Sequence, residues 1–328
     1  MASSTSAPLP DASKQNWVDR FAPEKLRPWL KLGRFDRPVG IWLLFLPGFM
    51  GLAFATTGVV TRNLSNGVEA ISVASDKTWH FPFYQTLLFL VGAALMRAAG
   101  CAYNDFVDRD FDAKVERTRG RPIPAGQITP KQALVFVAVC SLISLGILVQ
   151  LGFPAIWLGI ASLGLVAAYP FMKRITWWPQ AWLGLTFNWG FPMAVAAITH
   201  TLSLPVWIFY FGLMFWTLGY DTIYALQDME DDALIGVKST ARRLGKHTIL
   251  GVTIFYTAAV LLTAIAGHLA SLPVGFFIGL LLVLGHLFWQ VMNLRLDDGA
   301  WALKLFQSNR LTGLLWVFSL LLVHFKIF

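Results

Sequence analysis

The sequence predicts an all-α, polytopic membrane protein with nine transmembrane helices. Charged residues make up 13% of the 328 residues, about half of the roughly 25% that is usual in soluble domains. Hydrophobic residues reach 56%, and they come in repeated runs near the roughly 20 residues that span a hydrocarbon core. This composition excludes a soluble globular enzyme and a disordered chain.

Nine apolar segments are the expected transmembrane helices. They cover residues 39–60, 83–103, 132–151, 153–172, 178–199, 203–220, 249–268, 271–293 and 311–328. Pro38 stands where the first helix begins, and Pro47 should kink it. Residues 1–30 mix Ser, Pro and charge without a continuous apolar stretch, so we expect a flexible N-terminal tail rather than a signal peptide. One transmembrane domain should occupy residues 31–328.

The net charge and the cysteines point to a membrane setting. The formal charge of +8 is better explained by basic loops that face anionic lipid than by nucleic-acid binding. We therefore expect membrane lipid as a partner and no nucleic acid. Cys101 and Cys140 lie in or beside apolar segments, where reduced, packed thiols are expected rather than a disulfide.

Lys and Arg are distributed unevenly between alternate connections. Arg62, Lys77 and Lys326 fall on one side of the membrane, and the other Lys and Arg residues fall on the opposite side. Because positive side chains resist translocation, the N-terminus should be cytoplasmic. With nine spans, the C-terminus should then face the other compartment.

A dense polar cluster, CAYNDFVDRDFDAKVERTRGRPIPAG, follows the second span. Asn104, Asp108 and Asp112 are spaced i, i+4, i+8, which keeps three oxygen ligands on one helical face. Like charges at this spacing destabilise a helix slightly, and the repulsion grows near a low-dielectric interior. A bound cation should therefore occupy this face.

A second cluster, GYDTIYALQDMEDDALIGVKSTARRLGKH, follows the sixth span. Asp221, Asp228 and Asp232 are spaced by seven and then four residues, so they share one stripe if the sixth helix continues beyond the membrane surface. Four other acidic residues of the two clusters point elsewhere and rank second as ligands: Asp105, Asp110, Glu230 and Asp231.

Oxygen ligands without His or Cys favour a hard ion, and Mg²⁺ typically binds through one or two carboxylates together with substrate phosphates. Arg117 and Arg121 follow the first cluster, and Lys173 and Arg174 occupy the fourth connection. Guanidinium groups bind phosphate oxygens in bidentate fashion. The pattern predicts a lipid diphosphate whose tail enters the membrane and whose departing diphosphate leaves an allylic carbocation.

Two other interpretations stay open. Charged residues at the ends of spans are often a solvated face or a topology signal. Carboxylates inside a membrane protein also mark the ion paths of coupled carriers. Carriers place their sites near the bilayer midplane, whereas these clusters lie at the ends of spans, which favours the diphosphate site.

Five segments carry a family resemblance. They are LGRFDRPVG, NDFVDRDFD, ERTRGRPIPAG, YPFMKRITWWPQ and YDTIYALQDMEDDALIGVKST. From about residue 30 to 328 the chain resembles the UbiA superfamily of intramembrane prenyltransferases, and within it the bacterial 4-hydroxybenzoate polyprenyltransferase branch. Glu230 is a minor departure, in a stretch that is often richer in Asp.

The resemblance implies a nine-helix bundle with a lateral opening to lipid and a polar cytoplasmic cap. It also implies Mg²⁺-dependent transfer of a polyprenyl group from polyprenyl diphosphate to 4-hydroxybenzoate, on the ring carbon ortho to the hydroxyl, in ubiquinone biosynthesis. The expected location is a bacterial inner membrane with a cytoplasmic active site, a periplasmic C-terminus and no obligate protein partner. Homogentisate or another phenolic acid is the alternative acceptor, and haem or a naphthoate is more distant.

Residue roles carry over position by position. Asn104, Asp108 and Asp112 match the first metal-diphosphate motif, Asp228 and Asp232 match the second, and Arg117, Arg121 and Lys173 match diphosphate-binding positions with Tyr169 nearby. We expect Asp108 and Asp228 to take part in catalysis.

The acceptor and the carbocation make further demands. Asp221 could accept a hydrogen bond from the phenolic hydroxyl, bind metal or be structural. Arg174 or Arg34 could bind the acceptor carboxylate. Among the aromatic rings, Phe106, Tyr169, Tyr220 and Tyr224 could stabilise the cation, although packing is their default role.

Overall fold

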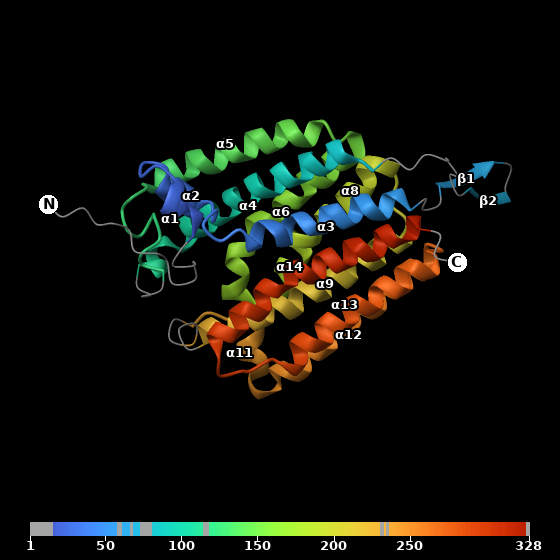
Figure 1. The fold of residues 1–328 in the computed structure, drawn as a ribbon. Helices are drawn as coiled ribbons and strands as arrows, with labels where there is room; N and C mark the ends of the chain where they lie inside the picture. Colours follow the sequence, from blue (N-terminus) through green and yellow to red (C-terminus); the bar gives the residue numbers. More distant parts are fainter. Residues whose placement is uncertain are drawn as a thin grey trace. The chain divides into compact units, whose positions relative to one another are not determined.

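The computed structural model describes residues 16–57, 61–65, 68–72, 81–113, 118–229, 233 and 236–325 (Figure 1). The helices are α1 (Trp17–Phe21), α2 (Arg27–Leu32), α3 (Val39–Thr56), α4 (Phe83–Asp112), α5 (Pro130–Val149), α6 (Phe153–Ile175), α7 (Pro179–Asn188), α8 (Gly190–Thr199), α9 (Leu204–Tyr224), α11 (Thr240–Leu244), α12 (Thr248–Leu269), α13 (Val274–Met292) and α14 (Gly299–Leu321). Short 3₁₀ turns are η1 (Ala225–Asp228), η2 (Gly245–His247) and η3 (Leu322–His324). One antiparallel hairpin pairs β1 (Thr61–Ser65) with β2 (Val68–Ser72).

The prediction of a helical membrane protein is confirmed. Within the described residues, eight helical stretches are long and apolar enough to cross a membrane: Val39–Thr56, Phe83–Asp112, Pro130–Val149, Phe153–Ile175, Pro179–Thr199, Thr240–Leu269, Val274–Met292 and Gly299–His324. The expected span 203–220 is also helical, as α9, but it is not among these eight. Its Trp, Tyr and Pro residues make it less hydrophobic than its neighbours.

Three boundaries differ from the expected ones. The last span begins at Gly299 rather than at 311, because the Asp298 side chain caps the helix by accepting a hydrogen bond from the Trp301 backbone N–H at 2.8 Å. Segment 178–199 forms two helices that meet at Trp189. Pro192 lacks the N–H that would continue the hydrogen-bond pattern across this junction. Finally, α4 continues to Asp112, so the first acidic motif is part of the helix.

The chain forms two compact units. The first comprises Met1–Trp42 and Leu90–Gln150, and the second comprises Leu43–Phe89 and Leu151–Phe328. In the first unit, Leu32 of α2, Ala102 of α4 and Ala133 of α5 are buried in a common apolar cluster. This cluster fixes the N-terminal segment to the part of α4 that carries the first motif. The proposed domain boundary at residues 30 and 31 stays a prediction.

In the second unit, α9 packs against α7, α12 and α14. Small residues allow these close approaches. A Cβ added at Gly212 of α9 would lie 2.8 Å from a methyl carbon of Thr263 on α12, and one at Gly184 of α7 would lie 2.8 Å from Met214 of α9. Figure 1 shows α9, α12, α13 and α14 running side by side. Most of one face of α9, including Trp216 and Tyr220, is buried.

A buried polar network joins four helices of this unit. Trp216 donates from its indole nitrogen to Asn309 Oδ1 at 2.7 Å, and Tyr256 donates from its hydroxyl to Gln290 Oε1 at 2.8 Å. The amides of Gln290 and Asn309 also hydrogen-bond to each other. All four side chains are almost fully buried. Because an unpaired polar group is costly in an apolar interior, the network fixes how α9, α12, α13 and α14 align.

We predict that Asn309→Ala lowers the free energy of unfolding by about 1–3 kcal/mol, because the buried donors of Trp216 and Gln290 lose their acceptor. Thermal unfolding of the detergent-solubilised protein measures the effect. Ser308→Ala is the matched control, since the Ser308 hydroxyl bonds only to the Leu305 carbonyl of its own helix. Equal melting temperatures for the two variants would contradict the prediction.

Candidate diphosphate and metal site

The first acidic motif lies in the last turns of α4. Asn104, Asp108 and Asp112 follow one another at intervals of four residues along this helix, so the expected shared face is formed. Asp108 is 1% exposed and Asp112 is 8% exposed. Two carboxylates are therefore held on one helical face with little access to water, which strengthens their attraction for cations.

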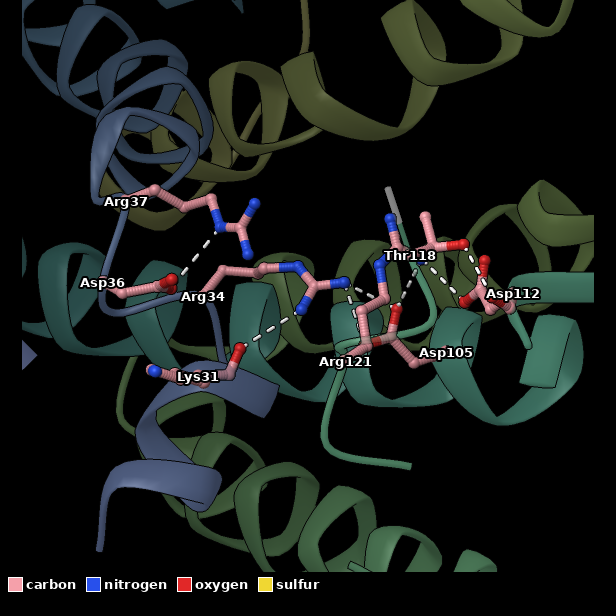
Figure 2. A network of polar contacts seen from close by, with 8 residues as sticks. All are labelled: Lys31, Arg34, Asp36, Arg37, Asp105, Asp112, Thr118 and Arg121. Carbon is pink, nitrogen blue, oxygen red and sulfur yellow. Dashed lines mark hydrogen bonds and ion pairs between the residues drawn. The ribbon is translucent and has the colours of Figure 1, made fainter. Parts of the chain in front are cut away.

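Asp105, on the same helix, is the centre of a buried ion-pair network (Figure 2). Arg34 donates from one terminal nitrogen to both carboxylate oxygens of Asp105, at 2.6 and 2.8 Å. Arg121 contacts Asp105 at 3.2 Å and Asp112 at 2.7 Å. The Asp105 side chain is fully buried. Asp105 thus connects the segment before α3 with the loop after α4.

The sequence predicts that Arg121 binds the diphosphate, and the structure places Arg121 beside the first motif. Its loop is tied back to α4 because the Thr118 hydroxyl donates to the Asp112 carbonyl at 2.9 Å. Figure 2 shows the guanidinium of Arg121 reaching back to Asp105 and Asp112. A planar cation is thereby placed beside the motif carboxylates, as diphosphate binding requires.

Arg34 adopts a left-handed backbone conformation with φ of 61°. Such a conformation costs about 1–3 kcal/mol in a non-glycine residue and persists only where neighbouring contacts hold it. The ion pair with Asp105 provides such a contact, and the guanidinium also donates to the Lys31 carbonyl at 3.2 Å. In the structure Arg34 is bound to a carboxylate of the protein itself, and its expected role toward an acceptor carboxylate stays a prediction.

Asp36 and Arg37 lie beside this network (Figure 2). Arg37 donates to one oxygen of Asp36 at 3.4 Å, and the carboxyl group of Asp36 is buried. Burial raises the pKa of this carboxyl above its usual range, although Arg37 and Arg34 oppose the shift. Asp36 and Arg37 thus form an ion pair just before α3.

The second acidic motif begins at the end of α9. Asp221 lies half-buried in the last turn of this helix. The α-helix ends at Tyr224 and passes into the 3₁₀ turn η1, which ends at Asp228. The α-helical spacing on which the Asp221, Asp228 and Asp232 stripe depends thus extends only to Tyr224. The side chain of Asp228 and the whole of Asp232 lie outside the described residues.

The sequence predicts that Lys173 and Arg174 lie in the fourth connection. In the structure both lie in the last turn of α6. Lys173 is half-buried, whereas Arg174 is exposed and its guanidinium lies 6.0 Å from the centre of the Phe171 ring. Tyr169 is one turn before Lys173 and is half-buried. Arg117, the remaining expected diphosphate ligand, lies outside the described residues.

Aromatic rings surround the end of α9. Phe306 of α14 lies 4.5 Å from the Tyr224 ring and 5.8 Å from the Tyr220 ring, measured between ring centres. Tyr220 in turn contacts Trp216 at 5.2 Å. Both tyrosines lie beside the second motif and therefore remain candidates to stabilise a carbocation. Phe306 is a third candidate, because its ring lies against theirs. Phe106, on α4, instead lies 5.0 Å from the guanidinium of Arg109.

The donor set of the first motif fits Mg²⁺. Among the described residues, no three His, Cys, Asp or Glu side chains form a cluster able to hold a metal ion by themselves. Asp108 and Asp112 supply two carboxylates on one face, and Asn104 adds an amide oxygen. A hard ion that takes the rest of its ligands from substrate phosphates and water needs no more than this.

The comparison with known families decides the identity of the fold. The model of the UbiA prenyltransferase family matches residues 44–319. This chain belongs to that family. The UbiA family resemblance expected from the five sequence segments is therefore confirmed.

Curated relatives extend the match over most of the chain. It is 41% identical to the mitochondrial 4-hydroxybenzoate polyprenyltransferase of Arabidopsis thaliana over 91% of this chain and 69% of that protein. It is 36% identical to the 4-hydroxybenzoate octaprenyltransferase of Tolumonas auensis over 89% of this chain and 95% of that protein. Both mitochondrial and bacterial members of the UbiA family are thus similar to it.

Solved UbiA structures share the fold. A homologue from Aeropyrum pernix gives a TM-score of 0.65 at 22% identity, covering 83% of this chain and 94% of that one. A homologue from Archaeoglobus fulgidus, bound to GPP and Mg²⁺, gives 0.62 at 16% identity, covering 90% and 99%. These structures confirm the UbiA-type helical architecture.

The sequence pattern ranks Asp105 second as a ligand, yet in the structure its side chain pairs with two arginines, Arg34 and Arg121. The signal was available: the sequence places Arg34 and Arg121 in two different motifs, and a buried Arg requires a carboxylate partner. Helical spacing alone could not reveal it, because Asp105 is one residue away from the face shared by Asn104 and Asp108.

We predict that Asp105→Asn destabilises the protein by about 3–5 kcal/mol, because it leaves the buried guanidinium of Arg34 without its counter-charge. Thermal unfolding in detergent measures the change. Asp110→Asn is the matched control on the same helix, since the Asp110 side chain is 78% exposed and its pair with Arg109 spans 3.6 Å. That variant should stay within about 0.5 kcal/mol of the parent. A similar small effect at Asp105 would contradict the assignment.

Proposed function

We propose that this protein is a 4-hydroxybenzoate polyprenyltransferase. In the presence of Mg²⁺ it transfers a polyprenyl group from polyprenyl diphosphate to the ring carbon ortho to the hydroxyl of 4-hydroxybenzoate, an early step of ubiquinone biosynthesis. The observation that supports this most strongly is the identity of 36–41% to 4-hydroxybenzoate prenyltransferases over about nine tenths of the chain. The buried carboxylates of α4 supply the chemistry that such a reaction needs.

In this proposal the first motif binds the metal and the diphosphate. Asn104, Asp108 and Asp112 hold Mg²⁺, and Asp228 and Asp232 form the second ligand set. When bound, the ion neutralises the negative charge of the diphosphate as a Lewis acid. Arg121 adds charge-assisted hydrogen bonds from beside Asp112, and Arg117 and Lys173 complete the diphosphate ligands, with Tyr169 nearby.

The protein groups act mainly on charge that develops during bond cleavage. As the bond between the prenyl carbon and the diphosphate oxygen breaks, negative charge grows on the leaving group and positive charge on the allyl carbon. Arginine and lysine side chains in an environment with little water stabilise the leaving group more than the substrate, which lowers the barrier. The apolar bundle keeps water from the cation, and Tyr220 or Tyr224 supplies an aromatic face.

The acceptor needs orientation and electron density at its ortho carbon. We assign Asp221 as acceptor of a hydrogen bond from the phenolic hydroxyl, because it lies in the last turn of α9 and is half-buried. The ring carbon then attacks the allyl carbon, and its proton is lost to restore aromaticity. Arg174 is the better candidate for the acceptor carboxylate, because Arg34 is already occupied by Asp105.

The helices support an integral membrane protein. We propose a bacterial inner membrane with the N-terminus and the active site cytoplasmic and the C-terminus periplasmic, on the distribution of Lys and Arg between alternate connections. This chain covers 95% of the bacterial relative from Tolumonas auensis but 69% of the mitochondrial relative from Arabidopsis thaliana. We propose no obligate protein partner and no nucleic-acid ligand.

We predict that Asp108→Ala and Asp228→Ala each lower prenyl transfer by at least about a hundredfold, because each removes a metal ligand whose contribution is several kcal/mol. Membranes containing each variant receive geranyl diphosphate, Mg²⁺ and radiolabelled 4-hydroxybenzoate, and the product is extracted into organic solvent. Asp297→Asn is the control, since Asp297 is an exposed carboxylate outside both motifs.

Two results would contradict parts of this proposal. Full activity in both Asp→Ala variants would remove the metal assignment. Transfer to homogentisate but not to 4-hydroxybenzoate would change the acceptor, and no transfer to any phenolic acid with short or long donors would favour the ion-coupled carrier.

We predict that a cysteine placed at the C-terminus is reachable only from the periplasm. In bacterial spheroplasts a membrane-impermeant maleimide should label Lys326→Cys but not Ser13→Cys, and inside-out vesicles should give the reverse. The two natural thiols are buried, so the parent protein serves as the unlabelled control. The same labelling pattern for both variants would be incompatible with nine spans.

A further inference from the structure

The end of α6 and the connection to α7 are hydrogen-bonded to the segment that follows the second acidic motif. The Lys238 backbone N–H donates to the Lys173 carbonyl at 2.9 Å, and its side chain donates to the Ile175 carbonyl at 3.1 Å. Arg242 places its guanidinium 5.5 Å from the centre of the Trp177 ring. We call residues 173–180 and 237–242, with the contacts between them, the loop clamp.

The centre of the loop clamp is one buried amide. The Gln180 side-chain oxygen accepts two hydrogen bonds from Thr240, one from the backbone N–H at 2.9 Å and one from the hydroxyl at 2.8 Å. Gln180 is 6% exposed and Thr240 is fully buried. Both residues lie at the start of helices: Gln180 is the second residue of α7, after Pro179, and Thr240 is the first residue of α11.

Both helix starts leave backbone donors that need partners. At α11 the Ser239 side chain caps the Arg242 N–H at 3.3 Å, and Gln180 satisfies the Thr240 N–H. The amide of a different helix thus completes the cap of α11. This arrangement fixes the start of α11 relative to the start of α7. It also fixes the distance between Lys173 and residues 237–242, which follow the second motif.

We propose that Gln180 and Thr240 are positioning residues for the diphosphate site. They act by holding the end of α6, which carries Lys173, against residues 237–242, so that Lys173 keeps a fixed position. The inference rests on the proposed function, because it gives Lys173 and the second motif the role of binding one Mg²⁺-diphosphate group.

The proposal concerns binding of the prenyl diphosphate. A loosened clamp should weaken this binding, because the charged group of the diphosphate needs several ligands at fixed positions. Binding of 4-hydroxybenzoate does not serve as a control, because Arg174, which is assigned to the acceptor carboxylate, is next to Lys173 within the clamp. A purely structural role would instead lower the melting temperature without changing the affinity for the diphosphate.

The experiment uses the full chain in detergent with three variants. Thr240→Val keeps the shape of the side chain and removes only the hydroxyl, Thr240→Ser keeps the hydroxyl, and Gln180→Leu removes the acceptor of both hydrogen bonds. Ser319→Ala is the matched control, because it removes a buried interhelical hydroxyl hydrogen bond to the Phe276 carbonyl at 2.9 Å, outside the clamp. Melting temperatures show which variants are folded.

Two readouts are compared. Calorimetry gives the Kd of a non-reactive thio analogue of geranyl diphosphate with Mg²⁺, and steady-state kinetics give KM for each substrate. Thr240→Val should raise both the Kd of the analogue and the KM of geranyl diphosphate about tenfold, the loss expected for one buried hydrogen bond. Gln180→Leu should have the larger effect if it folds, and Thr240→Ser should resemble the parent.

A Thr240→Val variant that behaves like Ser319→Ala, with a lower melting temperature and unchanged Kd and KM, would overturn the proposal. If the parent protein transfers no prenyl group, the proposed acceptor chemistry fails, whereas the calorimetric Kd still tests the clamp: an unchanged Kd in Thr240→Val rejects it, and a raised Kd supports it.

Discussion

The cost of burying charge in an apolar helical protein governs the described structure. An isolated charge in such surroundings is expensive, so ionisable groups are paired or bind ions. Asp105 meets this constraint through Arg34 and Arg121, and the second of these also reaches Asp112. Each ion pair removes a penalty and at the same time fixes a loop. Arg121, which we propose as a diphosphate ligand, is thereby held in place before the substrate arrives, and this reduces the ordering cost of binding.

The second unit meets the same constraint with neutral groups. Gln290 and Asn309 satisfy each other and also serve Trp216 and Tyr256, and Gln180 satisfies Thr240. Amide side chains suit this task because each has both donors and an acceptor. The first network lies within the helices and the second lies at their ends. A stable helical frame and an ordered connection near the second motif therefore arise from the same chemistry.

Much of the fold could be predicted from the sequence, because span length and hydropathy are set by the bilayer rather than by distant contacts. The first motif could also be predicted, since residues at i, i+4 and i+8 lie on one face of a continuous helix. Two features could not be predicted. The change from α-helix to 3₁₀ turn after Tyr224 has no clear periodic signal, and the contact of Gln180 with Thr240 joins residues 60 positions apart. The hairpin of β1 and β2 was missed because its segment resembles a polar loop.

The left-handed backbone at Arg34 has a consequence for which substitutions this position can accept. Its φ of 61° favours Gly or Asn, whereas the contacts with both Asp105 oxygens and with the Lys31 carbonyl require a long cationic side chain with several donors. No single residue satisfies both demands at low cost. Replacement by Gly would relieve the backbone and remove the cation, and replacement by Lys would keep the charge while retaining the strain. Each of these substitutions at position 34 therefore keeps one energetic cost. The constraint comes from the backbone conformation as much as from the charge.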